Sequence, residues 1–136
     1  LDRATSGLLV LTTAGDLVHR LTHPTRKVPK LYRIEFEGEL AEDAAALCEA
    51  GILLRGEERP TRPAVFSPDG PGRATLELRE GKTHQVRRMI RAVGGEVVGL
   101  HRARVGCLPM PNSLSPGEFR PLSPEERARL LSDKSL

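Results

Sequence analysis

The chain has 136 residues, a formal net charge of +3 and a pI near 9.2. This length is enough for one domain with a hydrophobic core, and the weak positive charge is compatible with a nucleic-acid partner without requiring one. Aromatic residues make up only 3% of the sequence, which argues against a protein that binds single strands by stacking bases on aromatic rings. Because there is no apolar run of roughly 18 residues and no leader pattern, we expect a cytoplasmic protein without a membrane span.

The first dozen residues combine a polar turn with a short apolar run. Asp2 stands in the turn, and residues 8–11 are four consecutive large apolar side chains. The run predicts a short strand over residues 8–12 that is buried on both faces. A carboxylate on a turn in front of a rigid strand is well placed for chemistry, although an aspartate in a turn more often only hydrogen-bonds the turn itself.

A short helix and a loop are expected next. Residues 13–16 fit a capping box, which opens a helix with Leu17 and Leu21 on one side. His23 and Pro24 then interrupt the pattern, so we expect His23 to be a loop residue without a catalytic role.

The middle of the chain alternates between strand and helix patterns. From residue 28 the apolar residues follow period two, so that Tyr32, Ile34 and Phe36 share one face of a half-buried strand. An alanine-rich stretch predicts a helix over residues 41–50. Further strands are expected over residues 52–54, near residues 64–66 and over residues 74–78.

The second informative stretch covers residues 82–93 and predicts an amphipathic helix. Its apolar residues have the spacing i, i+3, i+4 and i+7 of one helical face: Val86, Met89, Ile90 and Val93. Each residue turns a helix by about 100°, which places Arg87 at the edge of the apolar stripe. Arg87 is therefore the arginine of this helix that we expect to be partly buried.

The rest of the chain predicts one more strand and one more helix. The strand is expected over residues 97–100 with a basic continuation to residue 106, and the helix over residues 123–131, where a capping box includes Pro124. Cys48 and Cys107 are far apart and lack the spacing of metal ligands, so we expect small buried side chains in a reducing compartment and no metal site.

Three ordered stretches resemble the motifs of RNA pseudouridine synthases. Residues 1–8 (LDRATSGL) resemble the catalytic-aspartate motif, residues 30–32 (KLY) the Lys-x-Tyr motif, and residues 80–89 (EGKTHQVRRM) the third motif. The third motif, together with residues 100–106 (LHRARVG) and 116–122 (PGEFRPL), is most similar to the branch that modifies bacterial ribosomal RNA. The resemblance covers nearly the whole chain, with the motifs in the family's order.

The resemblance implies an α+β fold, with a mixed, largely antiparallel sheet flanked by helices, in which Asp2, Tyr32 and Arg87 converge in one cleft. Asp2 matches the essential aspartate, a nucleophile on the target uridine: the base or the sugar is attacked, the glycosidic bond breaks and the uracil is rejoined through carbon. Tyr32 matches the tyrosine that packs on the flipped base and has been assigned a proton-abstracting role. Arg87 matches the basic residue paired with the aspartate. The implied activity is isomerisation of uridine in ribosomal RNA to pseudouridine, without a cofactor.

The physical chemistry of these residue types agrees with the implied roles. Burial disfavours an ionised carboxylate, and a neighbouring guanidinium restores the charged form; arginine suits this role because its planar group is always charged and can bind two oxygens. We therefore predict that the side chains of Asp2 and Arg87 lie within about 4 Å of each other. Flipping a base out of its stack costs roughly a few kcal/mol, which the ring of Tyr32 can partly offset.

The other basic side chains are predicted to contact phosphates of ribosomal RNA, which position RNA without reading its sequence. Two histidines flank the expected site and can hydrogen-bond RNA. The full set of predicted RNA-contact residues is Arg3, Arg26, Lys27, Lys30, Lys82, His84, Gln85, Arg88, Arg91, His101, Arg102 and Arg104.

Relatives in this branch have upstream catalytic strands and a small N-terminal RNA-binding domain that are absent here. We therefore expect residues 1–136 to be the C-terminal portion of the catalytic domain. One alternative is a catalytically incomplete RNA-binding fragment of such an enzyme. Another is a carboxylate-based glycosidase that uses Asp2 and Glu80, which would need two carboxyl groups about 5–9 Å apart. No pattern in the sequence predicts the target uridine, the ribosomal subunit or the oligomeric state.

Overall fold

The computed structural model describes residues 1–22 and 28–131. His23, Arg26 and Lys27, which the sequence analysis singled out, lie outside the described residues. The elements are, in chain order, β1 (Ser6–Gly7), α1 (Gly15–Thr22), β2 (Lys30–Glu37), α2 (Ala44–Ala50), β3 (Val65–Pro68), β4 (Arg73–Leu78), α3 (Gln85–Ala92), β5 (Glu96–Val105), β6 (Leu108–Pro109) and α4 (Pro124–Leu130).

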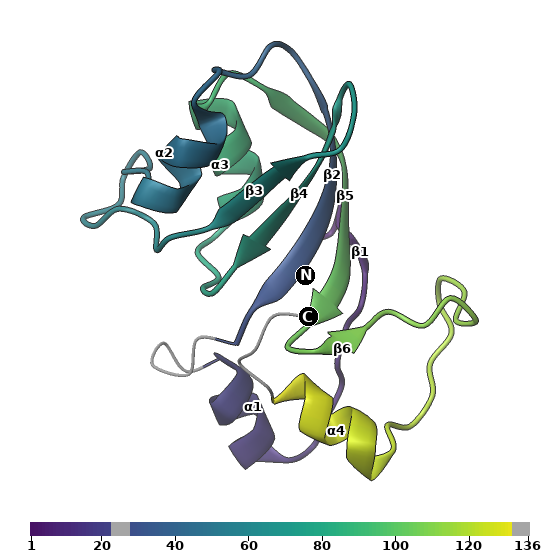
Figure 1. Ribbon diagram of the computed structural model, residues 1–136. Coiled ribbons are helices and arrows are strands. Elements are labelled where there is room, and N and C mark those ends of the chain that lie inside the picture. The colour runs from purple at the N-terminus through teal and green to yellow at the C-terminus, as the bar shows by residue number, and fades with distance from the viewer. Residues whose placement is uncertain (23–27, 132–136) are drawn as a thin grey trace.

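The strands form one six-stranded sheet in the order β1-β5-β2-β4-β3, with β6 paired to β5 (Figure 1). The pair β1–β5 is parallel, and the other pairs are antiparallel. The long β5 pairs with β2 along one edge, while β1 and then β6 occupy its other edge. The prediction of an α+β fold with a mixed, largely antiparallel sheet flanked by helices is therefore confirmed.

Helices α2 and α3 lie on one face of the sheet and close the main core (Figure 1). Ile34, Leu76, Met89 and Ile90 are at most 1% exposed there, and they come from β2, β4 and α3. Burial of this apolar area is the main stabilising contribution to the fold, at about 25 cal/mol per Å². A second, smaller cluster at the other end of the sheet joins α1 and α4 through Leu21 and Leu130.

The predicted periodicities of the long elements are confirmed. In β2 the apolar face carries the buried Ile34 and the half-buried Tyr32 and Phe36. In the helix predicted over residues 82–93, all four residues of the apolar stripe are at most 4% exposed. The capping box of α4 is formed, because the Ser123 side chain accepts a hydrogen bond from the Glu126 backbone and the Glu126 side chain accepts one from the Ser123 backbone.

The prediction of a strand over residues 8–12, buried on both faces, is wrong. Strand β1 ends at Gly7, and after the hydrogen bond from the Leu8 amide to the Arg102 carbonyl the chain leaves the sheet. Farther along β5 the same edge is taken by β6, so the apolar run finds no pairing partner there. Leu8 is buried, but Leu9 is 56% and Leu11 78% exposed.

Two more boundaries differ from the expectation. Residues 52–54 are a loop and not a strand, because the Ile52 backbone is hydrogen-bonded to Thr61 within the same irregular segment. Helices α2 and α3 begin three residues later than predicted, after turns. Cys48 is buried as expected, Cys107 is half-buried, and neither forms a disulfide. No helix in the described part of the chain is long and apolar enough to span a membrane.

Gly7 controls how the Asp2 turn joins the sheet, and its replacement tests this. Its φ is +108°, and a Cβ there would overlap the backbone of Arg102. A residue with a Cβ at this positive φ already pays the cost of a left-handed backbone. We predict that the overlap with Arg102 makes Gly7→Ala lower the free energy of unfolding by roughly 1–3 kcal/mol more, as overpacking does. The matched control is Gly70→Ala, with φ +85° and open space around its Cβ, which should cost only about 1–2 kcal/mol. Urea unfolding measures both, and equal losses would contradict the close approach of β1 and β5.

Candidate active site

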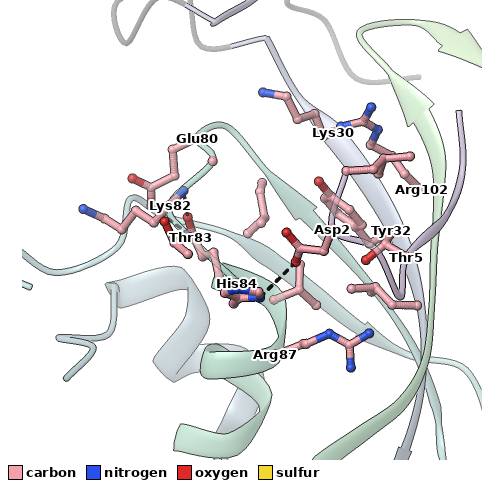
Figure 2. A pocket seen from close by; sticks show the side chains of 16 residues that line it. Asp2, Thr5, Lys30, Tyr32, Glu80, Lys82, Thr83, His84, Arg87 and Arg102 are labelled. Carbon is pink, nitrogen blue, oxygen red and sulfur yellow. Dashed lines mark hydrogen bonds and ion pairs between the residues drawn. The ribbon is translucent and has the colours of Figure 1, made fainter. Parts of the chain in front are cut away.

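A pocket of about 260 Å³ opens where the Asp2 turn, the start of β2 and the segment leading into α3 meet (Figure 2). Its lining includes Asp2, Tyr32 and Arg87, so the predicted convergence of these three residues is confirmed. Pockets for drug-sized ligands usually measure about 300–1,000 Å³. The smaller space here suits one flat fragment of a larger molecule.

Asp2 contacts His84 across this pocket. The His84 Nδ1 atom lies 3.3 Å from the Asp2 Oδ2 atom, and the two side chains are 56% and 39% exposed. His84 occupies the N-cap position of α3 in the left-handed conformation, with φ 50° and ψ 34°, and its side chain does not cap the helix. This backbone costs about 1–2 kcal/mol for a residue with a Cβ, and such strain concentrates at functional sites.

The predicted ion pair between Asp2 and Arg87 is not formed among the described residues. The Arg87 Nη2 atom instead donates to the Ala4 carbonyl oxygen, at 3.4 Å. The reason lies in the turn, where the Thr5 amide donates to the Asp2 carbonyl while the Asp2 carboxylate faces His84. His84, at the N-cap of α3, and Arg87, in its first turn, hold the same turn at two points.

The sheet side of the pocket carries Tyr32 and two cations, Lys30 and Arg102 (Figure 2). Tyr32 and Arg102 are register neighbours on β2 and β5. The Arg102 Nε atom donates to the Leu8 carbonyl at 2.9 Å. Burial, and secondly the charge of Arg102, lower the pKa of Lys30. Two half-buried cations that repel each other favour binding of an anion.

Gln85 and Glu80 hold the segment that leads into α3. The Glu80 Oε1 atom accepts hydrogen bonds from the Arg62 amide at 2.6 Å and from Gln85 Nε2 at 2.9 Å. The Gln85 Oε1 atom accepts one from the Lys82 amide, also at 2.9 Å. Gln85 is only 3% exposed, although it is among the residues that line the pocket, and its contact with RNA stays a prediction. Its role is to fix residues 80–84, and thereby His84.

Glu57, which the sequence analysis overlooked, binds two of the predicted phosphate contacts. Its carboxylate lies 3.3 Å from Lys82 Nζ and 3.2 Å from Arg88 Nη1. Arg88 also donates to the carbonyls of Thr83 and Arg55. Hydrogen bonds from Lys82 and Arg88 lower the pKa of Glu57. An acidic residue in an arginine-rich loop does not indicate from the sequence which cations it will bind.

The remaining predicted RNA contacts lie in different settings. Arg104 forms an ion pair with Glu77 at 3.0 Å and its side chain is 11% exposed, and its contact with phosphate stays a prediction. Arg91 pairs with Glu96 at the surface. His101 lies 2.9 Å from the Ser6 hydroxyl, and burial, then the charge of Arg33, lower its pKa. Arg3 is exposed.

No group of three metal-ligating side chains occurs in the described part of the chain.

The geometry thus defines a candidate active site in which acidic, aromatic and basic side chains line one small pocket. The lining of this small pocket includes two carboxylates, Asp2 and Glu80, together with a tyrosine ring and several cations. Glu80, the second carboxylate that a glycosidase would need, accepts two hydrogen bonds from the protein, and its side chain points away from Asp2 (Figure 2).

Comparisons with known proteins agree with this assignment. A sequence model of the family described as RNA pseudouridylate synthase matches residues 1–92. The chain is 41% identical over 131 residues to the ribosomal small subunit pseudouridine synthase A of Haemophilus influenzae, covering 96% of this chain and 56% of that protein. It is 40% identical over 131 residues to the protein of the same name from Escherichia coli K12, covering 96% and 57%.

A solved structure described as a pseudouridylate synthase superposes with a TM-score of 0.92 at 42% identity, covering 96% of this chain and 56% of that one. An archaeal box H/ACA Nop10–Cbf5 complex shares the fold alone, with a TM-score of 0.52 at 20% identity over 85% of this chain and 39% of that one. The chain therefore belongs to the RNA pseudouridylate synthase family. It spans little more than half the length of the curated relatives it matches.

The Glu57 ion pairs can be tested through the pH dependence of stability. Because its pKa is lowered in the folded state, Glu57 contributes stability that is present above its ordinary pKa near 4.5 and is lost as the pH falls through the folded-state value. We predict that Glu57→Gln lowers the urea midpoint at neutral pH and that the difference disappears in strong acid. The control Glu58→Gln removes an exposed neighbouring charge and should change neither. A deficit of Glu57→Gln that persists in strong acid would contradict the ion pairs.

Proposed function

We propose that this chain carries the catalytic site of an enzyme that isomerises uridine to pseudouridine in ribosomal RNA. The observation that carries the proposal is the Asp2 carboxylate, which faces the same small pocket as Tyr32 and Arg87. The relatives are named for the small ribosomal subunit, and we assign the same substrate class to this chain. Such an enzyme works in the cytoplasm, with its substrate.

Asp2 is the nucleophile in this proposal. Its carboxylate attacks either the uracil ring or the ribose C1′ atom of a flipped-out uridine. The bond between C1′ and N1 breaks, the uracil turns, and a bond between C1′ and C5 forms as Asp2 leaves. The C5 hydrogen departs as a proton and N1 gains one, so atoms and charge balance. Because the reaction is an isomerisation, it needs no external redox partner and no cofactor.

Tyr32 and Arg87 prepare the pocket for that step. Tyr32 is half-buried on β2 and lines the pocket, where its ring can cover the flipped base and offset part of the few kcal/mol that flipping costs. Arg87 holds the Ala4 carbonyl of the turn that carries Asp2. Its guanidinium also places a positive charge at the pocket that Asp2 lines.

The cations at the sheet side are assigned to RNA phosphate. Lys30 and Arg102 both line the pocket and repel each other, and a phosphate between them would relieve that repulsion. Arg3 is exposed on the turn that carries Asp2. Lys82 also lines the pocket, but its contact with Glu57 must be shared or broken before it can bind RNA.

The alternative is that the chain binds RNA without isomerising any uridine in it. Both possibilities use the same basic residues, so binding does not separate them. Turnover by residues 1–136 on their own would exclude the alternative, because a fragment with an incomplete site cannot release the C5 hydrogen.

The substitution Asp2→Asn tests the nucleophile. It keeps the shape of the side chain and removes the negative charge. We predict that release of tritium from C5 of uridine in a small-subunit ribosomal RNA transcript falls to background. Affinity for the same RNA should stay unchanged or rise slightly, because one negative charge near phosphate is gone. The experiment uses the longest natural form of the protein that carries these residues.

The control for this experiment is Asp69→Asn, an exposed aspartate in the turn between β3 and β4, which should release tritium at the normal rate. Normal release by Asp2→Asn would show that Asp2 is only a turn residue. Absence of release by the unsubstituted protein would favour the RNA-binding alternative.

A further inference from the structure

A groove of about 660 Å³ runs beside the candidate active site, between the loop at residues 53–55 and the exposed side of α3. It shares His84 and Arg87 with the catalytic pocket. A ligand that extends out of the catalytic pocket past these two residues therefore enters this groove next.

The ionisable lining of the groove is entirely basic. It consists of one histidine and four arginines, with no acidic side chain among the lining residues. A groove lined by one sign of charge concentrates ligands of the opposite sign. The groove therefore fits an anion.

The four arginines of the groove differ in the partners that already bind them. Arg88 is held by Glu57 and by two backbone carbonyls, and Arg91 is paired with Glu96. Arg55 is exposed and makes no ion pair with another described residue. Arg87 makes a single long hydrogen bond, at 3.4 Å, to Ala4. Arg55 and Arg87 are therefore the two guanidinium groups that can turn to an incoming phosphate, which arginine binds with two parallel hydrogen bonds.

The groove also has an exposed apolar surface. Leu53 is 64% exposed, although the neighbouring Leu54 is buried in the core. Arg88 donates to the Arg55 carbonyl at 2.6 Å, which fixes this loop against α3. An exposed apolar side chain beside the guanidinium groups of Arg55 and Arg87 matches a nucleotide, which joins a flat base to a phosphate.

We propose that this groove binds the nucleotide next to the target uridine in the same RNA strand, with its phosphate on Arg55 and Arg87 and its base against Leu53. This assignment rests on the proposed function, because the catalytic pocket must hold the uridine. It adds Leu53 and Arg55 to the residues that bind the substrate.

Arg55→Gln tests the phosphate contact, and Leu53→Ser tests the base contact. Affinity is measured for a fluorescein-labelled oligouridylate over a range of salt concentrations. We expect Arg55→Gln to weaken binding roughly tenfold, the effect of one charged hydrogen bond, and to reduce the slope of log K against log salt by about 0.7. Leu53→Ser should weaken binding and leave the slope unchanged, because it removes no charge. The matched control is Arg73→Gln on β4, an exposed arginine outside this groove and the catalytic pocket, which should change neither quantity.

Tritium release from the ribosomal transcript separates this subsite from the proposed function. Tritium release by the unsubstituted protein would show that it converts uridine in the transcript. Arg55→Gln should then raise KM and leave kcat unchanged, since Arg55 does not line the catalytic pocket. If the unsubstituted protein turns over and Arg55→Gln binds and reacts like Arg73→Gln, the subsite is wrong and the proposed function stands. If turnover is absent but the salt slope still depends on Arg55, the groove binds RNA and the proposed function is wrong.

Discussion

The site depends on the docking of one short turn between two distant parts of the chain. Strand β1 pairs in parallel with β5, and Gly7 permits the approach because any side chain there would overlap the β5 backbone. From the other side, His84 and Arg87 of α3 contact Asp2 and Ala4. The turn is thus fixed by the sheet on one side and by a helix on the other, and Asp2 acquires a defined direction that a free turn would lack.

A second constraint is that acidic side chains pair with some of the cations and not with others. Acidic partners neutralise several arginines and lysines: Glu57 binds Lys82 and Arg88, and Glu77 binds Arg104. Lys30 and Arg102, in contrast, lie close enough to repel each other at the catalytic pocket. A net charge of only +3 therefore understates the local positive charge at the candidate active site, because Lys30 and Arg102 both line its pocket.

The sequence was most informative where local periodicity determines structure. The period-two pattern of β2 and the helical stripe of α3 were predictable because burial acts on one face of each element. The ordered motifs also predicted that Asp2, Tyr32 and Arg87 share a pocket. The strand at residues 8–12 was mispredicted because its pairing edge is occupied by β6, a competition between segments about 100 residues apart that no local pattern reports.

The identity of side-chain partners was the least predictable part of the site. Gln85 and Arg104 have polar character that suggests RNA, yet one is buried in a hydrogen-bond network and the other in an ion pair. The Asp2 carboxylate contacts His84, which has a left-handed backbone, and not Arg87. These outcomes depend on angles and distances between elements, which follow only from the assembled fold.

The central claim is that the pocket beside Asp2 receives a uridine removed from its stack. The most direct measurement is a crystal structure of the protein, with Asp2 replaced by asparagine to prevent turnover, bound to a small-subunit ribosomal RNA fragment that is a substrate for the unsubstituted protein. The account predicts one uracil inside the pocket, covered by the Tyr32 ring, with the side chain at position 2 facing its ribose or base. A complex in which every uridine stays stacked in the RNA, or in which the flipped base occupies another site, would contradict it.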